Sequence, residues 1–471
     1  MHERVITNGR VGLSDGWADC DIGIDGGRIT ALGEGLKGAE ILDAAGLWVL
    51  PGGVDAHCHL DQPSWGGTEG ADGFGTGSLA AVFGGTTTIV PFAMPAPGTT
   101  MPQAVERSLA LAEGRSFADY SLHAIATEAT GPAQDQMDWL CAQGIPSVKA
   151  FMTYEGFAVS DERMLELMDG ARARGMTVMI HAENDAIIRH SRDKLLAAGR
   201  TALRYHLIAH SAAVEREAIH RVATLAEVTG ARVLIVHISS AQGIEELTRA
   251  RLRGTDVTGE TCPQYVLVPP AALDGPAEDA ARFLFCPPGR EAASHAALWQ
   301  ALEAGDIALW SSDHSPGPLA DKVAAEDFDK AVSGIPGLET RLPLLFSEGL
   351  ASGRLSLPRY LSVAGAAAAR YYGLEGKGAI APGFDADLVL WDPAARWQVR
   401  AAEQRSRAGY TPFEGRWLTG RPLTVLLRGR TVVADGRLAE RPPQGRFLPR
   451  RPLDPSTFRL PIEDTTPWLA A

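Results

Sequence analysis

The middle of this chain alternates between short β-rich runs and longer helical patterns. Runs rich in β-branched and aromatic residues lie at 86–93, 121–127, 147–153, 177–183, 232–239, 258–265 and 307–314. Amphipathic patterns typical of helices lie among them, at 101–114, 161–175, 211–230 and 241–252. Repeated β-then-α units build a parallel sheet, because each parallel connection needs a crossover that is usually helical. The repetition from 51 to 375 therefore predicts an α/β fold, a (β/α)₈ barrel of the TIM type.

The two ends of the chain share a different sequence pattern, which predicts short strands with alternating apolar and polar residues, separated by glycine and aspartate turns. It covers residues 1–50 and returns at 376–440. We expect the two pieces to form one small, discontinuous β-sandwich; two separate small domains are the alternative. Residues 441–471 are rich in proline and arginine, which predicts an extended arm over the surface or across to a neighbouring subunit.

Charge and cysteine content limit the partners and the compartment. The 471 residues include 44 Lys and Arg against 57 Asp and Glu, a formal net charge of −13. Such an acidic balance argues against nucleic acid and membrane surfaces as partners. Five cysteines without a CxxC pair suit a reducing compartment. Neither a signal peptide nor a membrane span is evident in the sequence, so we expect a cytoplasmic protein.

Imidazole and carboxylate side chains recur where the predicted strands end, which is where a barrel of this type carries its functional residues. His57 and His59 are two residues apart and would share one face of a strand. His181, His237 and Asp313 each follow an apolar run. Taken singly, each histidine is more often a hydrogen-bonded core residue, and Asp313 suits a turn. Their joint occurrence at equivalent strand ends favours a metal site.

One lysine, Lys149, stands in the middle of the apolar run at 147–153. A buried ammonium is costly and would repel metal cations. Desolvation favours the neutral amine, which reacts with CO₂ to give a carbamate. That anion has two oxygens and can bridge two divalent metals. The alternative, a lysine that reaches a distant carboxylate, leaves the strand-end histidines unexplained.

Together these motifs resemble the binuclear-metal cyclic amidohydrolases, specifically the dihydropyrimidinase and hydantoinase branch. The matching stretches, from about residue 50 to 392, are PGGVDAHCHLDQP, FGGTTTIV, SVKAFMTYEG, MIHAEN, VHISS, ETCPQY, SSDHSP and KGAIAPGFDADLVLWD. The resemblance implies two divalent metal ions, with zinc expected and manganese or cobalt as substitutes. It implies one metal on His57, His59 and Asp313 and a second on His181 and His237. Carboxylated Lys149 would bridge them.

The resemblance also implies a reaction. A metal-bridging hydroxide attacks a 5-substituted hydantoin or a dihydropyrimidine, and the ring opens to an N-carbamoyl amino acid. Tyr154 matches the tyrosine that hydrogen-bonds the developing oxyanion. Asp313 carries the hydroxide's proton to the departing ring nitrogen.

The substrate-binding positions carry further expectations. Main-chain groups at Cys286 and Ser333 match those that grip the ring amide, although both residues depart from the serine and asparagine of the hydantoinase pattern. Trp65 and Phe157 lie in loops that should line the pocket and favour an apolar or aromatic substituent. Packing within their own loops is the alternative for both residues.

Asp61, two residues after the second histidine, narrows the substrate class. Dihydroorotase-like relatives carry arginine there, and aspartate cannot supply its two-point grip on a carboxylate. Allantoinase-like relatives usually carry asparagine there, which disfavours allantoin and leaves it as an alternative. A cyclic imide is a further alternative, because it presents the same amide to the same metals. A non-catalytic scaffold is disfavoured because the ligand set is complete. A phosphotriesterase-like or urease-like hydrolase is disfavoured by Tyr154 and by the HLDQP and CPQY segments. The resemblance further implies a homotetramer or homodimer.

Overall fold

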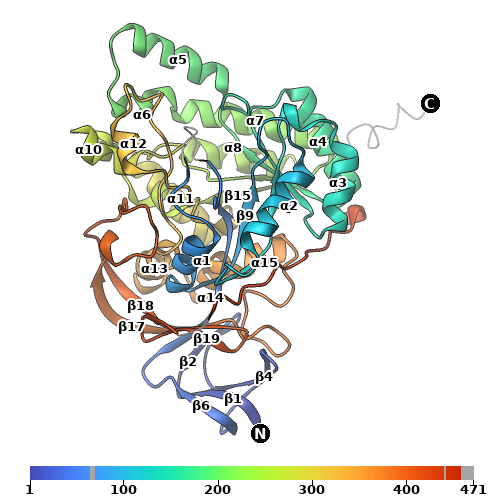
Figure 1. Cartoon of the computed structure of the whole chain (residues 1–471), viewed down its shortest axis with the longest axis vertical. Coiled ribbons are helices and arrows are strands. Elements are labelled where there is room, and N and C mark those ends of the chain that lie inside the picture. The colour runs from blue at the N-terminus through green and yellow to red at the C-terminus, as the bar shows by residue number, and fades with distance from the viewer. Residues whose placement is uncertain (64–68, 440–441, 458–471) are drawn as a thin grey trace.

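The computed structural model describes residues 1–63, 69–439 and 442–457. Within them, eight parallel strands form a barrel at the centre of the molecule (Figure 1). In chain order they are β8 (Gly53–Cys58), β9 (Thr86–Ala93), β11 (His123–Ile125), β12 (Ser147–Phe151), β13 (Thr177–His181), β14 (Val233–Ile235), β15 (Val257–Thr261) and β16 (Leu309–Trp310). A short strand, β10 (Asp119–Tyr120), also pairs with β9.

The first and last barrel strands meet just beyond the end of β16. The Asp313 amide donates to the carbonyl of His57 over 2.9 Å, and the His59 amide donates to the carbonyl of His314 over 2.8 Å. The barrel is therefore joined through the same short segments that carry His57, His59 and Asp313. The predicted (β/α)₈ fold class is confirmed.

Helices surround the barrel (Figure 1). Their bounds are α1 (Phe74–Phe83), α2 (Met101–Ala112), α3 (Ala133–Ala142), α4 (Asp161–Ala173), α5 (Asp185–Ala197), α6 (His206–Ala209), α7 (Ala212–Thr229), α8 (Ala241–Leu252), α9 (Pro263–Leu267), α10 (Ala277–Ala280), α11 (Ala292–Ala304), α12 (Leu319–Val323), α13 (Arg341–Leu345), α14 (Leu357–Leu361) and α15 (Ala367–Tyr371). The four helices predicted from periodicity correspond to α2, α4, α7 and α8. The Ser160 side chain caps α4 by accepting a hydrogen bond from the Arg163 amide.

One predicted strand, 258–265, is too long. β15 ends at Thr261, and α9 begins two residues later. Pro263 is the first residue of this helix. Proline is tolerated there because backbone N–H groups in the first turn of a helix have no acceptor within the helix. The β-rich composition continues past Pro263, but the proline marks the change from strand to helix.

Two further sheets lie below the barrel in Figure 1. One has the order β5 (Arg28–Gly33), β4 (Asp21–Asp25), β1 (His2–Thr7), β6 (Gly38–Asp43). The other joins both chain ends, in the order β20 (Arg437–Leu438), β19 (Arg430–Ala434), β18 (Trp417–Leu427), β17 (Leu388–Gln398), β7 (Trp48–Pro51), β2 (Arg10–Leu13), β3 (Gly16–Asp19). Side chains of both sheets, Ile22 and Ile24 with Leu388 and Leu426 among them, share one buried apolar cluster. A small sandwich built from both chain ends, as expected, therefore flanks the barrel.

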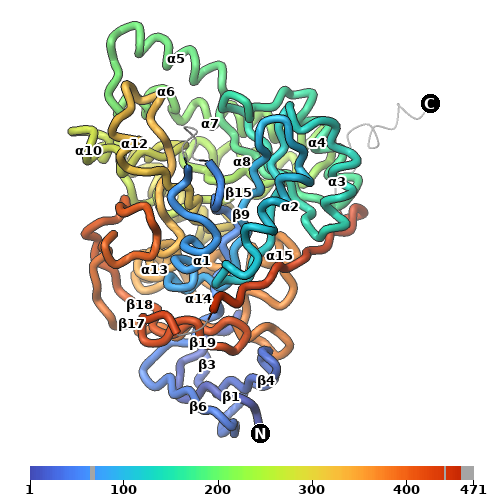
Figure 2. Tube along the Cα trace, in the orientation of Figure 1, coloured from blue at the N-terminus to red at the C-terminus, as the bar shows by residue number. Residues whose placement is uncertain are grey.

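The described part of the C-terminal arm runs along the chain's own barrel (Figure 2). The Leu453 amide donates to the carbonyl of Gly175, just before β13 begins. The Arg450 side chain is buried and donates to Ser121 Oγ over 2.9 Å and to Ser147 Oγ over 2.8 Å. The arm thus covers the amino ends of β11, β12 and β13, opposite the strand ends that carry the histidines.

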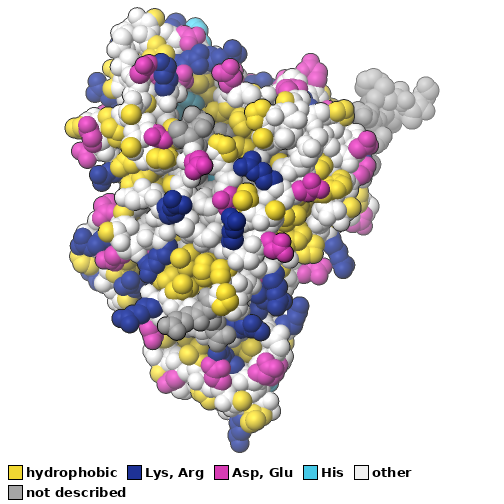
Figure 3. Space-filling model, in the orientation of Figure 1, with side chains coloured by type: hydrophobic (Ala, Val, Ile, Leu, Met, Phe, Trp, Pro, Cys, Tyr) yellow, Lys and Arg dark blue, Asp and Glu magenta, His cyan; other side chains and the backbone are white. Residues whose placement is uncertain are grey.

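The surface mixes acidic and basic side chains on the face seen in Figure 3. All five cysteines are free thiols. Within the described ranges, no helix combines the length and the apolar character needed to cross a bilayer. The homotetramer or homodimer and the cytoplasmic location stay predictions.

Candidate active site

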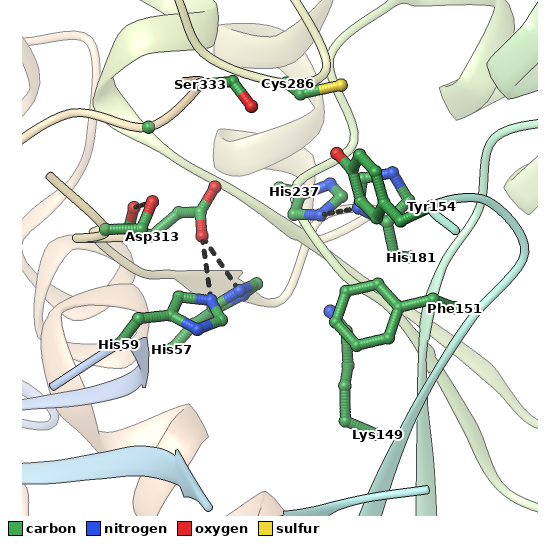
Figure 4. Close-up of a pocket in the computed structure, with 12 residues that line it drawn as sticks. His57, His59, Lys149, Phe151, Tyr154, His181, His237, Cys286, Asp313 and Ser333 are labelled. Carbon is green, nitrogen blue, oxygen red and sulfur yellow. Dashed lines mark hydrogen bonds and ion pairs between the residues drawn. The ribbon is translucent and has the colours of Figure 1, made fainter. Parts of the chain in front are cut away.

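The six side chains expected to bind metal all point into one pocket at the carboxyl ends of the barrel strands (Figure 4). All are buried. They come from β8 and the residue following it (His57, His59), from β12 (Lys149), from the end of β13 (His181), and from the segments after β14 and β16 (His237, Asp313). Closure of the barrel thus brings together His57 and Asp313, which are 256 positions apart in sequence. The sequence predicts this, because the carboxyl ends of parallel strands meet at one end of a barrel.

His57, His59 and Asp313 form the first group. Asp313 Oδ1 lies 3.1 Å from His57 Nε2 and 3.5 Å from His59 Nε2. Although burial opposes the shift, the carboxylates of Glu260 and Asp313 raise the pKa of His57 to about 9. Burial also opposes the shift of Asp313, but His57 outweighs burial and, with a hydrogen bond from His59, holds the pKa of Asp313 well below its usual range. Two imidazoles and an ionised carboxylate that converge in this way fit a divalent cation.

His181 and His237 form the second group. His181 Nδ1 and His237 Nε2 face each other at 2.8 Å. Burial lowers the pKa of both rings, which keeps them neutral. Two neutral imidazoles directed at one point can each offer a nitrogen lone pair to a metal.

Lys149 lies between the two groups (Figure 4). Its side chain is 1% exposed, and its Nζ lies 5.2 Å from the ring centre of Phe92 and 5.0 Å from that of Phe151. Burial lowers the pKa of the amine to about 7, against the opposing influence of Asp313 and Glu260. A substantial fraction of this amine is therefore neutral near pH 7, which is the form that can react with CO₂.

Two buried carboxylates that sequence reasoning missed orient the histidine rings. Glu260 Oε1 lies 2.6 Å from His57 Nδ1, and the Ser311 hydroxyl donates to Glu260 Oε2 over 2.8 Å. Glu183 Oε2 lies 2.9 Å from His181 Nε2. Carboxylates in these positions fix the orientation of metal-binding imidazoles. A signal was present for Glu183, which ends the strand predicted at 177–183, whereas Glu260 stands near the start of the strand predicted at 258–265.

The backbone is strained at three of the predicted functional residues. Tyr154, His237 and Asp313 adopt φ values of 78°, 38° and 49°, in the left-handed region that residues other than glycine rarely occupy. Such conformations persist where the surrounding structure enforces them, and they cluster at functional sites.

Tyr154, Cys286 and Ser333 form the rim of the pocket (Figure 4). Burial raises the pKa of Tyr154 well above its usual value, so the phenol keeps its proton. The loops of Cys286 and Ser333 are joined directly, because the Gly334 amide donates to the carbonyl of Leu284 over 3.1 Å. The expected substrate-gripping positions are therefore brought together above the metal-ligand candidates.

A larger cavity of about 920 Å³ opens beside the pocket and shares Tyr154, Cys286 and Ser333 with it. Phe157 lines this cavity, and its ring also packs edge-on against Phe151 with centres 5.9 Å apart. Phe157 thus lines the cavity and packs against β12, and its contact with a substrate stays a prediction. Trp65 lies outside the described residues.

Asp61 is engaged away from the metal-ligand candidates. Its Oδ2 accepts a hydrogen bond of 2.6 Å from the Phe74 amide, the first residue of α1. An aspartate here satisfies a helix amino terminus. It supplies no cationic group for a substrate carboxylate, in agreement with the argument against dihydroorotate.

A parallel barrel with imidazoles, a carboxylate and a lysine at its strand ends defines a metal-dependent barrel hydrolase. Residues 48–432 match the model of the amidohydrolase family. A D-hydantoinase of Ralstonia pickettii is 37% identical over 452 residues, covering 95% of this chain and 98% of its own. A D-hydantoinase of Streptomyces coelicolor is 38% identical, covering 95% and 97%.

A solved structure of dihydropyrimidinase from Brevibacillus agri superimposes with a TM-score of 0.93 at 34% identity, covering 96% of this chain and 99% of that one. The chain belongs to the amidohydrolase family. The assignment from sequence motifs to the hydantoinase and dihydropyrimidinase branch of this family is confirmed.

Proposed function

We propose that this protein opens a 5-substituted hydantoin or a dihydropyrimidine ring by hydrolysis and releases an N-carbamoyl amino acid. The observation that carries the proposal is the convergence of Lys149 with two histidine groups and Asp313 in one buried pocket. Tyr154 at the rim adds the expected donor. The hydantoinases and dihydropyrimidinase similar to this chain support the choice of ring.

Two divalent ions, zinc in the first place, fit these residues. His57, His59 and Asp313 would hold one, and the facing nitrogens of His181 and His237 would hold the other. Lys149 would take up CO₂ on its neutral amine and release one proton, and the resulting carbamate would bridge the two ions. When bound, the metals would supply a water activated for attack and would polarise the amide carbonyl.

The chain's own groups would handle the proton and the developing charge. Asp313 is ionised at neutral pH and can accept the proton of the attacking water, then return it to the departing ring nitrogen. Tyr154 is protonated and can donate a hydrogen bond to the oxyanion. Main-chain groups at Cys286 and Ser333 would hold the ring amide at the rim.

The adjoining cavity would accept the ring substituent. Phe157, Ile188 and Phe328 contribute apolar surface to its lining. Charged side chains, among them Arg107, Asp185, Arg189 and Asp329, line the cavity as well. We expect an apolar or aromatic 5-substituent to pack against Phe157, which follows the rim residue Tyr154 by three positions.

A substrate panel tests the proposal. The protein is loaded with zinc in bicarbonate and assayed on dihydrouracil, a 5-aryl hydantoin, allantoin and a simple cyclic imide, with metal-stripped protein as the control. Ring opening of dihydrouracil or the hydantoin to its carbamoyl acid, in the loaded protein only, is expected. Opening of allantoin or the imide alone would overturn the substrate assignment. No opening by protein that holds two metals would overturn the proposed rings and place the substrate outside this panel.

A further inference from the structure

A second cluster of metal-binding groups lies beside the proposed binuclear centre. Cys286 Sγ is 3.1 Å from Glu183 Oε2 and 3.3 Å from His210 Nδ1, and His210 Nδ1 is 3.0 Å from Glu183 Oε1. Ligand atoms of His206, His210 and Cys286 all lie within 4.8 Å of one another, and so do those of His181, Glu183 and Cys286, so that Cys286 belongs to both groups. The four side chains are buried, so water competes little for them.

The spacing of these atoms suits a tetrahedral ion. Zinc binds sulfur at about 2.3 Å and imidazole nitrogen at about 2.0–2.1 Å, which places ligand atoms roughly 3.3–3.6 Å apart. The separations of Cys286 Sγ from His210 Nδ1 and from Glu183 Oε2 need to widen by only a few tenths of an ångström, and His210 Nδ1 meets the other oxygen of the same carboxylate, Oε1. A thiolate with imidazole favours zinc and its soft relative cadmium over magnesium or calcium.

The local fold holds the cluster together. His206 opens α6 and His210 follows its last residue, so the two lie four positions apart with ring centres 4.2 Å from each other. Arg290 is buried and donates through Nη1 to the carbonyl of His210 over 2.6 Å and through Nε to Ser239 Oγ over 3.0 Å. Cys286 and Arg290 belong to the same loop, which therefore fixes the thiol against His210.

We propose that Cys286, His210 and Glu183, with His206 completing the set, form a third metal site for Zn²⁺ or Cd²⁺. Binding breaks the S–H bond of Cys286, forms a sulfur–metal bond and releases one proton to solvent. The site has a thiol ligand, whereas the ligands proposed for the binuclear centre are imidazole, carboxylate and carbamate. Its occupancy can therefore be read separately.

A metal ion bound at this site would inhibit ring opening. This inhibitory role rests on the proposed function. Glu183 Oε2 also contacts His181 Nε2, so an ion that takes Glu183 would loosen the orientation of His181. Cys286 lines both the metal-ligand pocket and the 920 Å³ cavity. An ion on its sulfur would stand where a substrate must pass.

Cadmium titration of the zinc-loaded protein tests the site, with thiolate-to-cadmium charge-transfer absorption as the readout. We expect this band to saturate at one cadmium per chain, to vanish in Cys286→Ser, and to need at least about tenfold more cadmium in His210→Gln. Cys141→Ser, which alters a thiol outside the cluster, should keep the band. Circular dichroism confirms that each variant is folded. If Cys286→Ser does not fold, His210→Gln decides.

The proposal is overturned if wild type shows no band, if the band survives in Cys286→Ser, or if His210→Gln binds cadmium as tightly as wild type. Ring opening is measured in the same titration, and we expect wild type to lose activity as the band grows. Activity that persists at full cadmium occupancy would overturn the inhibitory role. A protein that binds cadmium in this way but opens no ring would instead contradict the proposed function.

Discussion

Oε1 of Glu260 lies 2.6 Å from Nδ1 of His57, and neither side chain is more than 1% exposed. The hydrogen bond leaves Nε2 of the same ring directed at Asp313, 3.1 Å away. Glu260 thereby determines which nitrogen of His57 is offered to a metal, although the glutamate itself stands one layer behind the pocket.

Glu260→Gln should weaken metal binding without removing a proposed ligand. An amide is a poorer partner for the Nδ1–H of His57, and loss of such a carboxylate typically lowers metal affinity about 10–100-fold. Metal content after dialysis against graded chelator measures the change. Glu245→Gln, on the exposed face of α8, is the matched control. Unchanged metal retention in Glu260→Gln would contradict the role.

Tyr154→Phe should lower kcat more than it raises KM. The phenol keeps its proton and lies at the rim, so it can act on charge that develops only in the transition state. Loss of one oxyanion donor typically costs about 10²–10³ in kcat. Steady-state kinetics on the best substrate of the panel give both constants. The two metals should be retained, and Tyr205→Phe should leave kcat unchanged. A rise in KM alone would show that Tyr154 only binds substrate.

Much of the site was predictable because its chemistry is local to strand ends. His181, His237 and Asp313 each follow an apolar run that periodicity identifies, and the carboxyl ends of parallel strands must meet at one end of a barrel. Lys149 stood out for a related reason, since an ionisable side chain within an apolar run needs a partner. These inferences need only the fold class and the position of each residue along its strand.

Contacts between distant segments were not predictable in this way. His210 and Cys286 meet because α6 and a loop 76 positions away fold over the same pocket, and neither segment has a periodic signal. α1 and α11 were also missed, because their sequences are rich in alanine and other apolar residues and lack a clear polar face. Tertiary packing, rather than local pattern, defines such elements.

Reconstitution of metal-stripped protein should depend on pH through Lys149. Burial lowers the pKa of this amine to about 7, so the neutral form that reacts with CO₂ prevails above that pH and the ammonium prevails below it. At a fixed concentration of dissolved CO₂ and saturating zinc, the initial rate of reactivation should therefore level off above about pH 7 and fall about tenfold per pH unit below it. Lys149→Met should regain no activity at any pH. A rate that is flat from pH 6 to 8 would contradict carbamate formation on this lysine.

Lys322→Met should impair substrate binding through the two rim loops. Lys322 Nζ donates to the carbonyl of Leu284, two residues before Cys286, over 2.9 Å and to that of Gly334, which directly follows Ser333. Each carbonyl keeps one other donor, the Gly334 amide for Leu284 and the Tyr410 hydroxyl for Gly334, so the variant loses only the two hydrogen bonds from Lys322, about 0.5–1.5 kcal/mol each. Looser loops should raise KM about tenfold. Kinetics in the zinc-loaded variant measure the KM and kcat effects separately. Lys330→Met, at an exposed position on the neighbouring segment, should behave as wild type. An unchanged KM would show that Lys322 does not position these loops.

Arg450→Met should destabilise the fold while leaving catalysis intact. The Arg450 guanidinium is buried against Ser121, Leu122 and Ser147 at the amino ends of the barrel strands, opposite the pocket. Its removal leaves those acceptors without their donor, which should lower the free energy of unfolding by about 2–3 kcal/mol. Urea unfolding of the zinc-loaded protein measures the loss, and Arg451→Met, an exposed neighbour, should cost little. Because the pocket lies at the opposite ends of the strands, kcat and KM should match wild type at urea concentrations below the unfolding transition. An unchanged unfolding midpoint in Arg450→Met would mean that the arm rests on the barrel without stabilising it.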